Sequence, residues 1–202
     1  MSTAGQPAPR QERSRAKRDR ILTTTAQLLA ELPYEQIGTK LIAERSGVAI
    51  GSLYRYFTDK SAIVTALAVR WLDEMVGVLA RSLADPPAEL AALIDRIVEA
   101  YAEFWRQEPG FHQLWYGAVP GLRIPAETTD DNDEQLVSLL FPVLVARYSL
   151  PDGPAMRLRT GVAVTVTSTL LNEAFRHDPH GDPGLLAELK LLLRRYLTEP
   201  DR

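Results

Sequence analysis

The sequence predicts an all-α protein in which a small three-helix domain at the N-terminus is joined by one long helix to a larger helical domain. The stretch Thr39–Lys60 has the pattern of two short helices around a tight turn. After it, apolar residues repeat at intervals of three and four, which is the period of one helix face. The β-branched run Val162–Thr169 favours a strand by propensity, but no second strand is available to pair with it, so we expect a helix there too.

The composition limits the classes of protein to which the chain can belong. Its 202 residues are 46% hydrophobic, which is enough to build a real core. The absence of cysteine excludes a disulfide framework, a thiolate nucleophile and a cysteine zinc site. No apolar run reaches the roughly 18–20 residues of a membrane span, and the N-terminus is polar. We therefore expect a cytoplasmic protein that does not contact a membrane.

The charge is distributed unevenly along the chain. Residues 1–60 carry ten Lys and Arg against six Asp and Glu, whereas residues 61–202 carry 13 against 20. A basic N-terminal end on an acidic remainder is typical of a protein that binds nucleic acid at one end. The excess is modest and only supports other evidence.

The N-terminal region is expected to hold a disordered arm and then the first helix. Residues 1–12 are rich in Pro, Ala, Gly and Gln and have nothing to bury, so we expect them to be disordered. The basic run Arg13–Arg20 then enters a helix. Such a run is usually a solvated helix face, but beside a helix-turn-helix we favour contact with phosphates, with an arm reaching toward the minor groove. Apolar residues continue the helix to Glu31, and Pro33 ends it.

The helix-turn-helix occupies most of residues 13–62, which we predict to form one domain. Gly38 or Thr39 starts its first helix, and Gly47 supplies the positive φ that a sharp turn between helices needs. The residues spaced to face a small core are Val48, Leu53 and Phe57. The residues left to point outward are Lys40, Ile50, Ser52, Tyr54, Arg55, Tyr56 and Lys60. Hydroxyls and Lys suit phosphate oxygens, and an apolar tip suits a thymine methyl in the major groove.

This stretch resembles the DNA-binding domain of the tetracycline-repressor (TetR) family of bacterial regulators. The resemblance covers roughly residues 13–68 and is carried by Ile42-Ala43, Ser46-Gly47-Val48, Gly51-Ser52-Leu53-Tyr54, Tyr56-Phe57 and Lys60. It implies that phosphates are contacted by Thr39, Ser52, Tyr54, Tyr56 and Lys60. It implies that Lys40, Ala49, Ile50, Gly51 and Arg55 lie nearer the base edges. Two positions depart from the family pattern: Gly38 stands where Thr is common, and Ile50, which cannot hydrogen-bond a base, stands where a polar residue is common.

Residues 63–202 are predicted to form the second domain, which is entirely helical. A long helix from about Lys60 to Leu83 carries an apolar stripe at spacing four, starts beside the DNA-binding domain and enters the second domain, so it is the natural mechanical link. The other expected helices are residues 88–107, one or two turns at 111–117, 131–148 with a kink at Pro142, 155–176 and 184–197. The loops between them are expected at 119–129, 151–154 and 178–183.

An unusual group of aromatic residues lies between Tyr101 and Tyr116. Ordinary core packing is one interpretation, and the wall of an apolar cavity with a few polar groups is the other. The resemblance implies a ligand in this domain that moves the linking helix and releases DNA. The candidate ligand-binding residues are Trp71, Met75, Tyr101, Phe104, Trp105, Phe111, His112, Trp115, Tyr116, Arg123 and Asn172. We expect an apolar or aromatic small molecule.

The last two helices are apolar on nearly all sides. A helix without a polar face must be buried on more than one side, and a second subunit is the natural cover in a domain of this size. Two helices from each subunit would give a four-helix bundle with two-fold symmetry. That symmetry predicts a homodimer on an inverted-repeat operator.

Other possible sites are weaker. The acidic run Asp130–Glu134 is contiguous rather than alternating, so we interpret it as a solvated helix start and not as a cation site. His177 and His180 lack a third ligand, and no catalytic constellation or phosphate-binding loop is present in order. We expect no metal, no cofactor and no enzymatic activity. Two alternatives remain: a carrier or enzyme that uses the aromatic cavity, and a DNA-binding dimer regulated by a protein partner.

Overall fold

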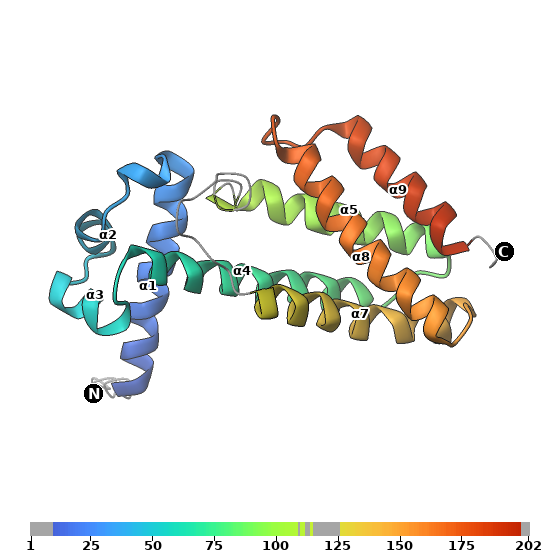
Figure 1. The fold of residues 1–202 in the computed structure, drawn as a ribbon, viewed down its shortest axis with the longest axis horizontal. Coiled ribbons are helices and arrows are strands. Elements are labelled where there is room, and N and C mark those ends of the chain that lie inside the picture. The colour runs from blue at the N-terminus through green and yellow to red at the C-terminus, as the bar shows by residue number, and fades with distance from the viewer. Residues whose placement is uncertain (1–9, 109, 112–113, 115–125, 199–202) are drawn as a thin grey trace, which may run out of the picture.

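The computed structural model describes residues 10–108, 110–111, 114 and 126–198. The described part is helical and contains no strand, which confirms the predicted fold class (Figure 1). Val162–Thr169 lies within a helix, as expected from the lack of a pairing strand. None of the described helices combines the length and the apolar character needed to cross a bilayer.

The N-terminal part, which we call the head, contains the first three helices and a short 3₁₀ turn. Their bounds are α1 (Arg10–Glu31), η1 (Tyr34–Gln36), α2 (Thr39–Ser46) and α3 (Ile50–Tyr56). Residues 10–12 are therefore helical, whereas the sequence predicted a disordered arm up to residue 12. Glu12 lies in the first turn of α1, where a negative charge interacts favourably with the helix dipole and so stabilises the helix. Residues 1–9 lie outside the described part of the chain.

The turn between α2 and α3 has the geometry that the sequence predicts. Gly47 adopts φ 63° in the left-handed region, and its N–H donates to the carbonyls of Ala43 and Glu44. The head core is closed by side chains that are fully or nearly fully buried: Ile21, Leu22, Leu28, Leu29, Ile37, Ile42, Val48, Leu53 and Phe57. Because this small core is filled, α3 has one fixed orientation on α1 and α2.

The linking helix α4 runs from Lys60 to Leu83, as predicted. The Asp59 carboxylate caps it by accepting a hydrogen bond from the N–H of Ala62 at 2.8 Å. The helix packs against α1 at one end and against α5 and α7 along the rest of its length (Figure 1). A single rigid element therefore belongs to both parts of the molecule.

The remaining helices form the body, and they pack on one another and on α4 (Figure 1). They are α5 (Leu90–Gln107), α7 (Ala126–Tyr148), α8 (Pro154–Phe175) and α9 (Pro183–Thr198). The predicted loop at 119–129 is wrong in its last part, because α7 starts at Ala126 and places the acidic run in its second turn. Pro142 lies inside α7, and the turns expected at 111–117 lie mostly outside the described residues.

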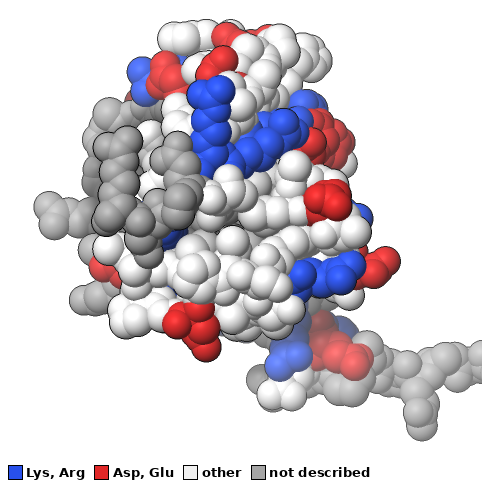
Figure 2. Space-filling model, turned by 90° about the vertical axis from the view of Figure 1, so that its right-hand side faces the viewer, with Lys and Arg blue, Asp and Glu red and all other residues white. Residues whose placement is uncertain are grey.

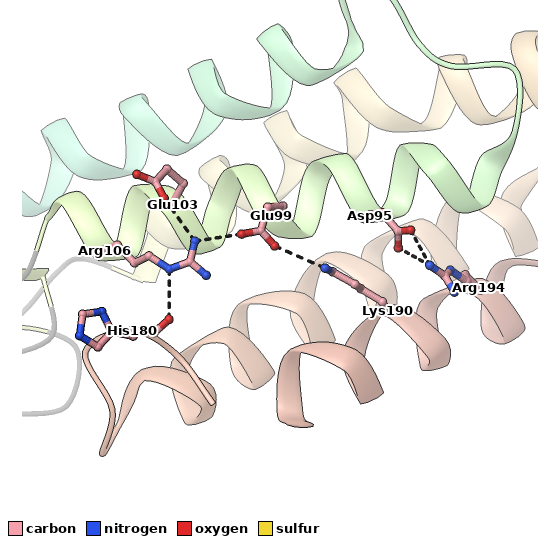
Figure 3. Close-up of polar contacts among 7 residues, drawn as sticks. All are labelled: Asp95, Glu99, Glu103, Arg106, His180, Lys190 and Arg194. Carbon is pink, nitrogen blue, oxygen red and sulfur yellow. Dashed lines mark hydrogen bonds and ion pairs between the residues drawn. The ribbon is translucent and has the colours of Figure 1, made fainter. Parts of the chain in front are cut away.

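A row of ion pairs joins α5 to α9 (Figure 3). Arg194 pairs with Asp95, and the Lys190 ammonium lies 3.4 Å from Glu99. Arg106 donates to Glu99 at 2.9 Å and, through Nε, to the carbonyl of His180 at 3.1 Å. These side chains are partly exposed, so each pair contributes little stability by itself. Together they connect α9 and the loop before it to one face of α5.

Candidate nucleic-acid interface and internal cavity

The exposed face of α3 carries large side chains that the head core does not use. Ile50 is 43% exposed and Tyr54 is 51% exposed, although Leu53 between them is fully buried. The other candidate contact residues that are exposed are Lys40, Ala49, Gly51 and Arg55, and those partly exposed are Thr39, Ser52, Tyr56 and Lys60. The structure thus brings the predicted contact residues to the outside of the head, and the predicted core residues to its inside.

Hydroxyl groups of α2 and α3 meet at the start of α2. The Thr39 hydroxyl lies 3.0 Å from the Tyr54 hydroxyl, at a helix N-terminus with free backbone N–H groups. On α3, the Arg55 guanidinium donates to the Ser52 hydroxyl at 2.7 Å, which orients both side chains. Paired hydroxyls next to free N–H groups can donate to an anion such as a phosphate.

The first turns of α1 extend this surface. The Ser14 hydroxyl donates to the Tyr56 hydroxyl at 3.2 Å, and Arg13, Lys17 and Arg55 line an open groove around this pair. The sequence predicted that the basic run would contact phosphates. It did not predict that Ser14 takes part, or that Arg13 and Lys17 are the two cations of the run that line this groove. The signal was their spacing, because Arg13 and Lys17 are four residues apart and so share one helix face.

Lys60 is held more tightly than the sequence indicated. Its ammonium donates to the Tyr34 carbonyl at 2.9 Å and lies 3.7 Å from the centre of the Tyr34 ring. Partial burial lowers the pKa of Lys60, against an opposing effect of Glu35. At least one of its three donors is therefore committed within the head.

Charge on the opposite end of the molecule is arranged differently. Figure 2 views the end of the body farthest from the head, and it shows basic and acidic side chains interspersed over uncharged surface. In the groove around Tyr56, by contrast, the charged lining residues are all cations. Of these two regions, the groove at the head therefore offers an anion the better position.

An internal cavity of about 200 Å³ lies in the body between α4, α5, α7, α8 and α9. Its described lining is mostly apolar and includes Met75, Tyr101, Trp105, Phe111 and Asn172 of the predicted ligand-binding residues. His112, Trp115, Tyr116 and Arg123, which the sequence also proposed, lie outside the described residues.

Trp71 and Phe104, which the sequence also predicted to bind a ligand, do not belong to the described cavity lining. Their rings pack edge-on against Phe111 with centroids at 5.3 and 5.8 Å. The Trp71 indole N–H donates to the Glu108 carboxylate at 3.0 Å, so its one polar group is used. The aromatic group is thus divided: Tyr101, Trp105 and Phe111 form cavity wall, and the other two described rings form packed core behind it.

Several polar lining residues were missed by the sequence reasoning. They are Thr129, Asn132 and Asp133 on α7, and Thr167 and Ser168 on α8. Asn132 is only 7% exposed, and burial raises the pKa of Asp133. The acidic run 130–134 is therefore not wholly a solvated helix start. The available signal was the spacing of Thr129, Asp133, Leu136 and Leu140, which follows one helix face.

The outer surface of α8 and α9 exposes large apolar side chains. Leu158 is 69% exposed, and the others are Val162, Leu191 and Leu192. The inner faces of both helices are buried in the body through residues that include Val164, Leu171, Leu189 and Leu193. Two neighbouring helices with an exposed apolar side are typical of a surface that another protein chain covers.

Within the described residues, no group of three or more His, Asp or Glu is placed to hold a metal ion.

Family models match most of the chain. The model described as "Tetracyclin repressor-like, C-terminal domain" matches residues 88–200, and the model described as "Bacterial regulatory proteins, tetR family" matches residues 21–67.

Curated relatives match over a shorter stretch. The HTH-type transcriptional repressor KstR of Mycobacterium tuberculosis is 31% identical over 112 residues, which cover 45% of this chain and 51% of the relative. The repressor of the same name from Rhodococcus jostii is 38% identical over 68 residues, covering 33% and 32%. The chain thus spans about half or less of the length of the curated relatives it matches.

Solved structures match nearly the whole chain. A TetR-family transcriptional regulator from Streptomyces coelicolor has a TM-score of 0.69 and 28% identity over 91% of this chain and 97% of the other. The fatty acid degradation regulator FadR from Bacillus halodurans has a TM-score of 0.63 at 18% identity, over 97% and 100%. At that lower identity the likeness concerns the fold alone.

Proposed function

This chain belongs to the TetR family of DNA-binding transcriptional regulators, and on that premise we propose that it is a homodimeric repressor that binds an inverted-repeat operator and is released by a small apolar or aromatic molecule. The observation that carries the proposal is the face of α3, where Ile50 and Tyr54 are about half exposed on a closed core. We propose residues 13–62 as the DNA-binding domain and residues 63–202 as the ligand-binding and dimerisation domain, acting in the cytoplasm where the DNA lies.

The contacts with DNA divide into positioning and reading. Thr39, Ser52, Tyr54 and Tyr56 bind phosphates, with hydroxyls that are already oriented by one another or by neighbouring side chains. Lys60 adds a charge at the start of α4. The residues proposed to lie nearer the base edges are Lys40, Ala49, Ile50, Gly51 and Arg55. Ile50 presents an apolar end that suits a thymine methyl.

The dimer forms through α8 and α9. Leu158, Val162, Leu191 and Leu192 leave an apolar surface on these two helices, while their other sides are buried within the body. Pairing this surface with itself about a two-fold axis makes the four-helix bundle and fixes two heads at one spacing. The half-sites of the operator then lie one or more helical turns apart.

Two structural connections support control of the head by the cavity. Leu72, Met75 and Leu79 bring α4 into the cavity wall, and the same helix is capped beside the head at Asp59. Phe111 lines the cavity, and its neighbour Gly110 is so close to α1 that an added Cβ would lie 2.5 Å from the Ala26 carbonyl oxygen. A ligand that shifts Phe111 or α4 therefore moves groups that touch α1.

The two alternatives receive less support. The carrier or enzyme interpretation is disfavoured because both matched family models are of transcriptional regulators. Regulation by a protein partner alone does not account for a cavity of about 200 Å³ inside the body. We therefore retain the ligand-responsive repressor.

The test is a footprint of the purified protein on DNA upstream of its own gene and of neighbouring genes, at two salt concentrations. A protected inverted repeat that weakens steeply with salt is expected, because phosphate contacts release counterions. Diffuse protection without sequence preference would contradict the operator-binding part. If the protein sediments as a monomer and protects only a single half-site, these results would contradict the proposed dimer.

A further inference from the structure

The cavity is polar at one end and aliphatic at the other. Its polar lining residues lie in the second half of α5, in the first turns of α7 and in the second half of α8: Tyr101, Thr129, Asn132, Asp133, Thr167, Ser168 and Asn172. The lining at the opposite ends of these helices and on α9 is Leu90, Leu93, Ile94, Leu140, Leu144, Leu193 and Leu197. In Figure 1 the start of α7 and the end of α8 lie toward the head, so the polar end of the cavity faces the head.

Three of the hydroxyl donors at the polar end, those of Tyr101, Thr167 and Ser168, are already used within the protein. The Tyr101 hydroxyl donates to the Met75 carbonyl at 3.1 Å. The Thr167 hydroxyl donates to the Ala163 carbonyl at 2.7 Å, and the Ser168 hydroxyl donates to the Thr165 carbonyl at 3.0 Å. Each of these oxygens keeps lone pairs that can still accept a hydrogen bond. These three hydroxyls therefore offer a ligand acceptors and not donors.

Two further groups strengthen this acceptor character. The Asn172 side-chain oxygen is buried and has no hydrogen-bond partner, and an unpaired buried acceptor is costly. Asp133 adds a carboxyl group, and its charge repels the ionised form of Tyr101, which contributes after burial to the raised pKa of that hydroxyl. Burial also raises the pKa of Asp133, although a hydrogen bond with the Asn132 side chain opposes this effect, so its charged form still gains from a further donor or a cation. No Lys, Arg or His belongs to the described lining.

On the basis of the ligand-responsive function proposed above, we infer that the ligand is an elongated apolar molecule that ends in a hydrogen-bond donor, an amine or a hydroxyl, placed between Asp133 and Asn172. Its apolar part extends away from the head along the leucine-lined half of the cavity. Carboxylates of the same length are disfavoured, because they would bring a second negative charge and more acceptors to a site that already has both. This is more specific than an apolar or aromatic ligand.

The test uses three probes with the same ten-carbon chain: 1-decylamine, 1-decanol and decanoate, each below its micelle concentration. Calorimetry on the full-length protein, without DNA, measures binding directly. We expect the amine to bind most tightly, the alcohol next, and decanoate at least about tenfold more weakly than the amine. Decanoate that binds as tightly as the amine overturns the inference, and so does the absence of saturable binding by all three probes.

Matched variants of the protein test where the donor group of the bound probe lies. Asp133→Asn keeps size and removes charge, and it should reduce the preference for amine over alcohol by about tenfold. Asp131→Asn, an exposed position on the same helix, removes the same charge outside the described lining and should leave the preference unchanged. Asn172→Leu removes the unpaired acceptor and should weaken the binding of 1-decanol. An unchanged preference in Asp133→Asn, with a normal melting curve, overturns the assignment.

Operator release is measured separately on the footprinted DNA. If the amine binds with the expected preference but does not release DNA, the ligand chemistry stands and the release mechanism proposed above fails. If decanoate alone both binds and releases DNA, the release mechanism stands and the ligand chemistry fails.

Discussion

The head and the body are both helical, but they place their functional residues on opposite sides of their cores. In the head the core is filled, and Tyr54 and Ile50 lie outside on a helix of only seven residues. In the body the helices are longer, and the polar groups of interest, such as Asn132, face an internal space of about 200 Å³. A surface that matches DNA needs one fixed shape, whereas the ligand-responsive site that we propose in the body needs room to change.

Removing the head core should give the largest effect. Leu53 is fully buried under α3, so Leu53→Ala should cost roughly 2–5 kcal/mol of head stability and abolish operator binding. Hydrogen exchange by residue would show loss of protection in α1 to α3 with much smaller change in α5, α8 and α9. Equal loss of protection in both parts would mean that the head and body fold as one unit.

The exposed face should be sensitive in function but not in stability. Tyr54→Ala removes the proposed phosphate donor and its pairing with Thr39, so operator affinity should fall by roughly 10- to 100-fold on every operator variant. The melting temperature should change little because Tyr54 is 51% exposed. Tyr54→Phe keeps the ring and separates the contribution of the hydroxyl. A loss that depends on operator sequence would contradict a phosphate role.

The junction between the two parts can be tested at Gly110. An added Cβ would lie 2.5 Å from the Ala26 carbonyl oxygen and 3.1 Å from the Leu29 Cβ, so Gly110→Ala should destabilise by about 1–3 kcal/mol and displace α1. Operator affinity should fall although no contact residue changes. Gly77→Ala is the control, because its Cβ would meet only the movable end of Arg81. Unchanged affinity in Gly110→Ala would show that this contact does not position the head.

Ile50 should affect selection rather than overall binding. Ile50→Ala removes the apolar end proposed to touch a thymine methyl, worth about 1 kcal/mol at that base pair. Affinities for a set of single-base operator variants should show flattened preference at one position of each half-site. A uniform loss across the set would place Ile50 among the residues that do not read sequence.

The smallest effect is expected at the ion pairs of the body. Hydrogen bonding by Arg106 is the main cause that lowers the pKa of Glu99, so this carboxylate stabilises the fold above its unfolded pKa of about 4.3 and loses that contribution as pH falls through the lower folded value. Glu99 is about half exposed, so Glu99→Gln should cost only about 0.2–1 kcal/mol at pH 7 and less at a second, acidic pH below the unfolded pKa. Urea midpoints at both pH values measure it, with the exposed Glu188→Gln as control. A pH-independent cost would point to packing instead.

The head could be predicted from sequence more completely than the body. Its decisive features lie in one short stretch: Gly47 at the turn, Leu53 inside and Tyr54 outside follow from local geometry and helix period. The long helix Lys60–Leu83 was predicted for the same reason. Local pattern could not show that the Lys60 ammonium donates a hydrogen bond to the Tyr34 carbonyl, because the two residues are 26 positions apart.

The cavity depends on distances between helices that a sequence pattern does not contain. Trp71 and Trp105 both lie on the apolar stripe of a helix, yet only Trp105 belongs to the described wall. Asp133 lies in an acidic run that looks solvated, and only the position of α7 against α4 and α8 brings it to the cavity. Helix faces can be predicted from period, but which side chains leave space between helices depends on how five helices pack together.

The ion pairs between α5 and α9 also show what does not fix the position of α9. The acids Asp95, Glu99 and Glu103 and the bases Lys190 and Arg194 are each spaced by four residues on antiparallel helices. If α9 slid by one turn, about 5.4 Å, Arg194 would meet Glu99 and Lys190 would meet Glu103, so both bases would still be paired. The ion pairs are therefore compatible with more than one register of α9 against α5. Leu189, Leu193 and Leu197 repeat the same four-residue spacing, so contacts other than this shared spacing of charges and leucines fix the register of α9.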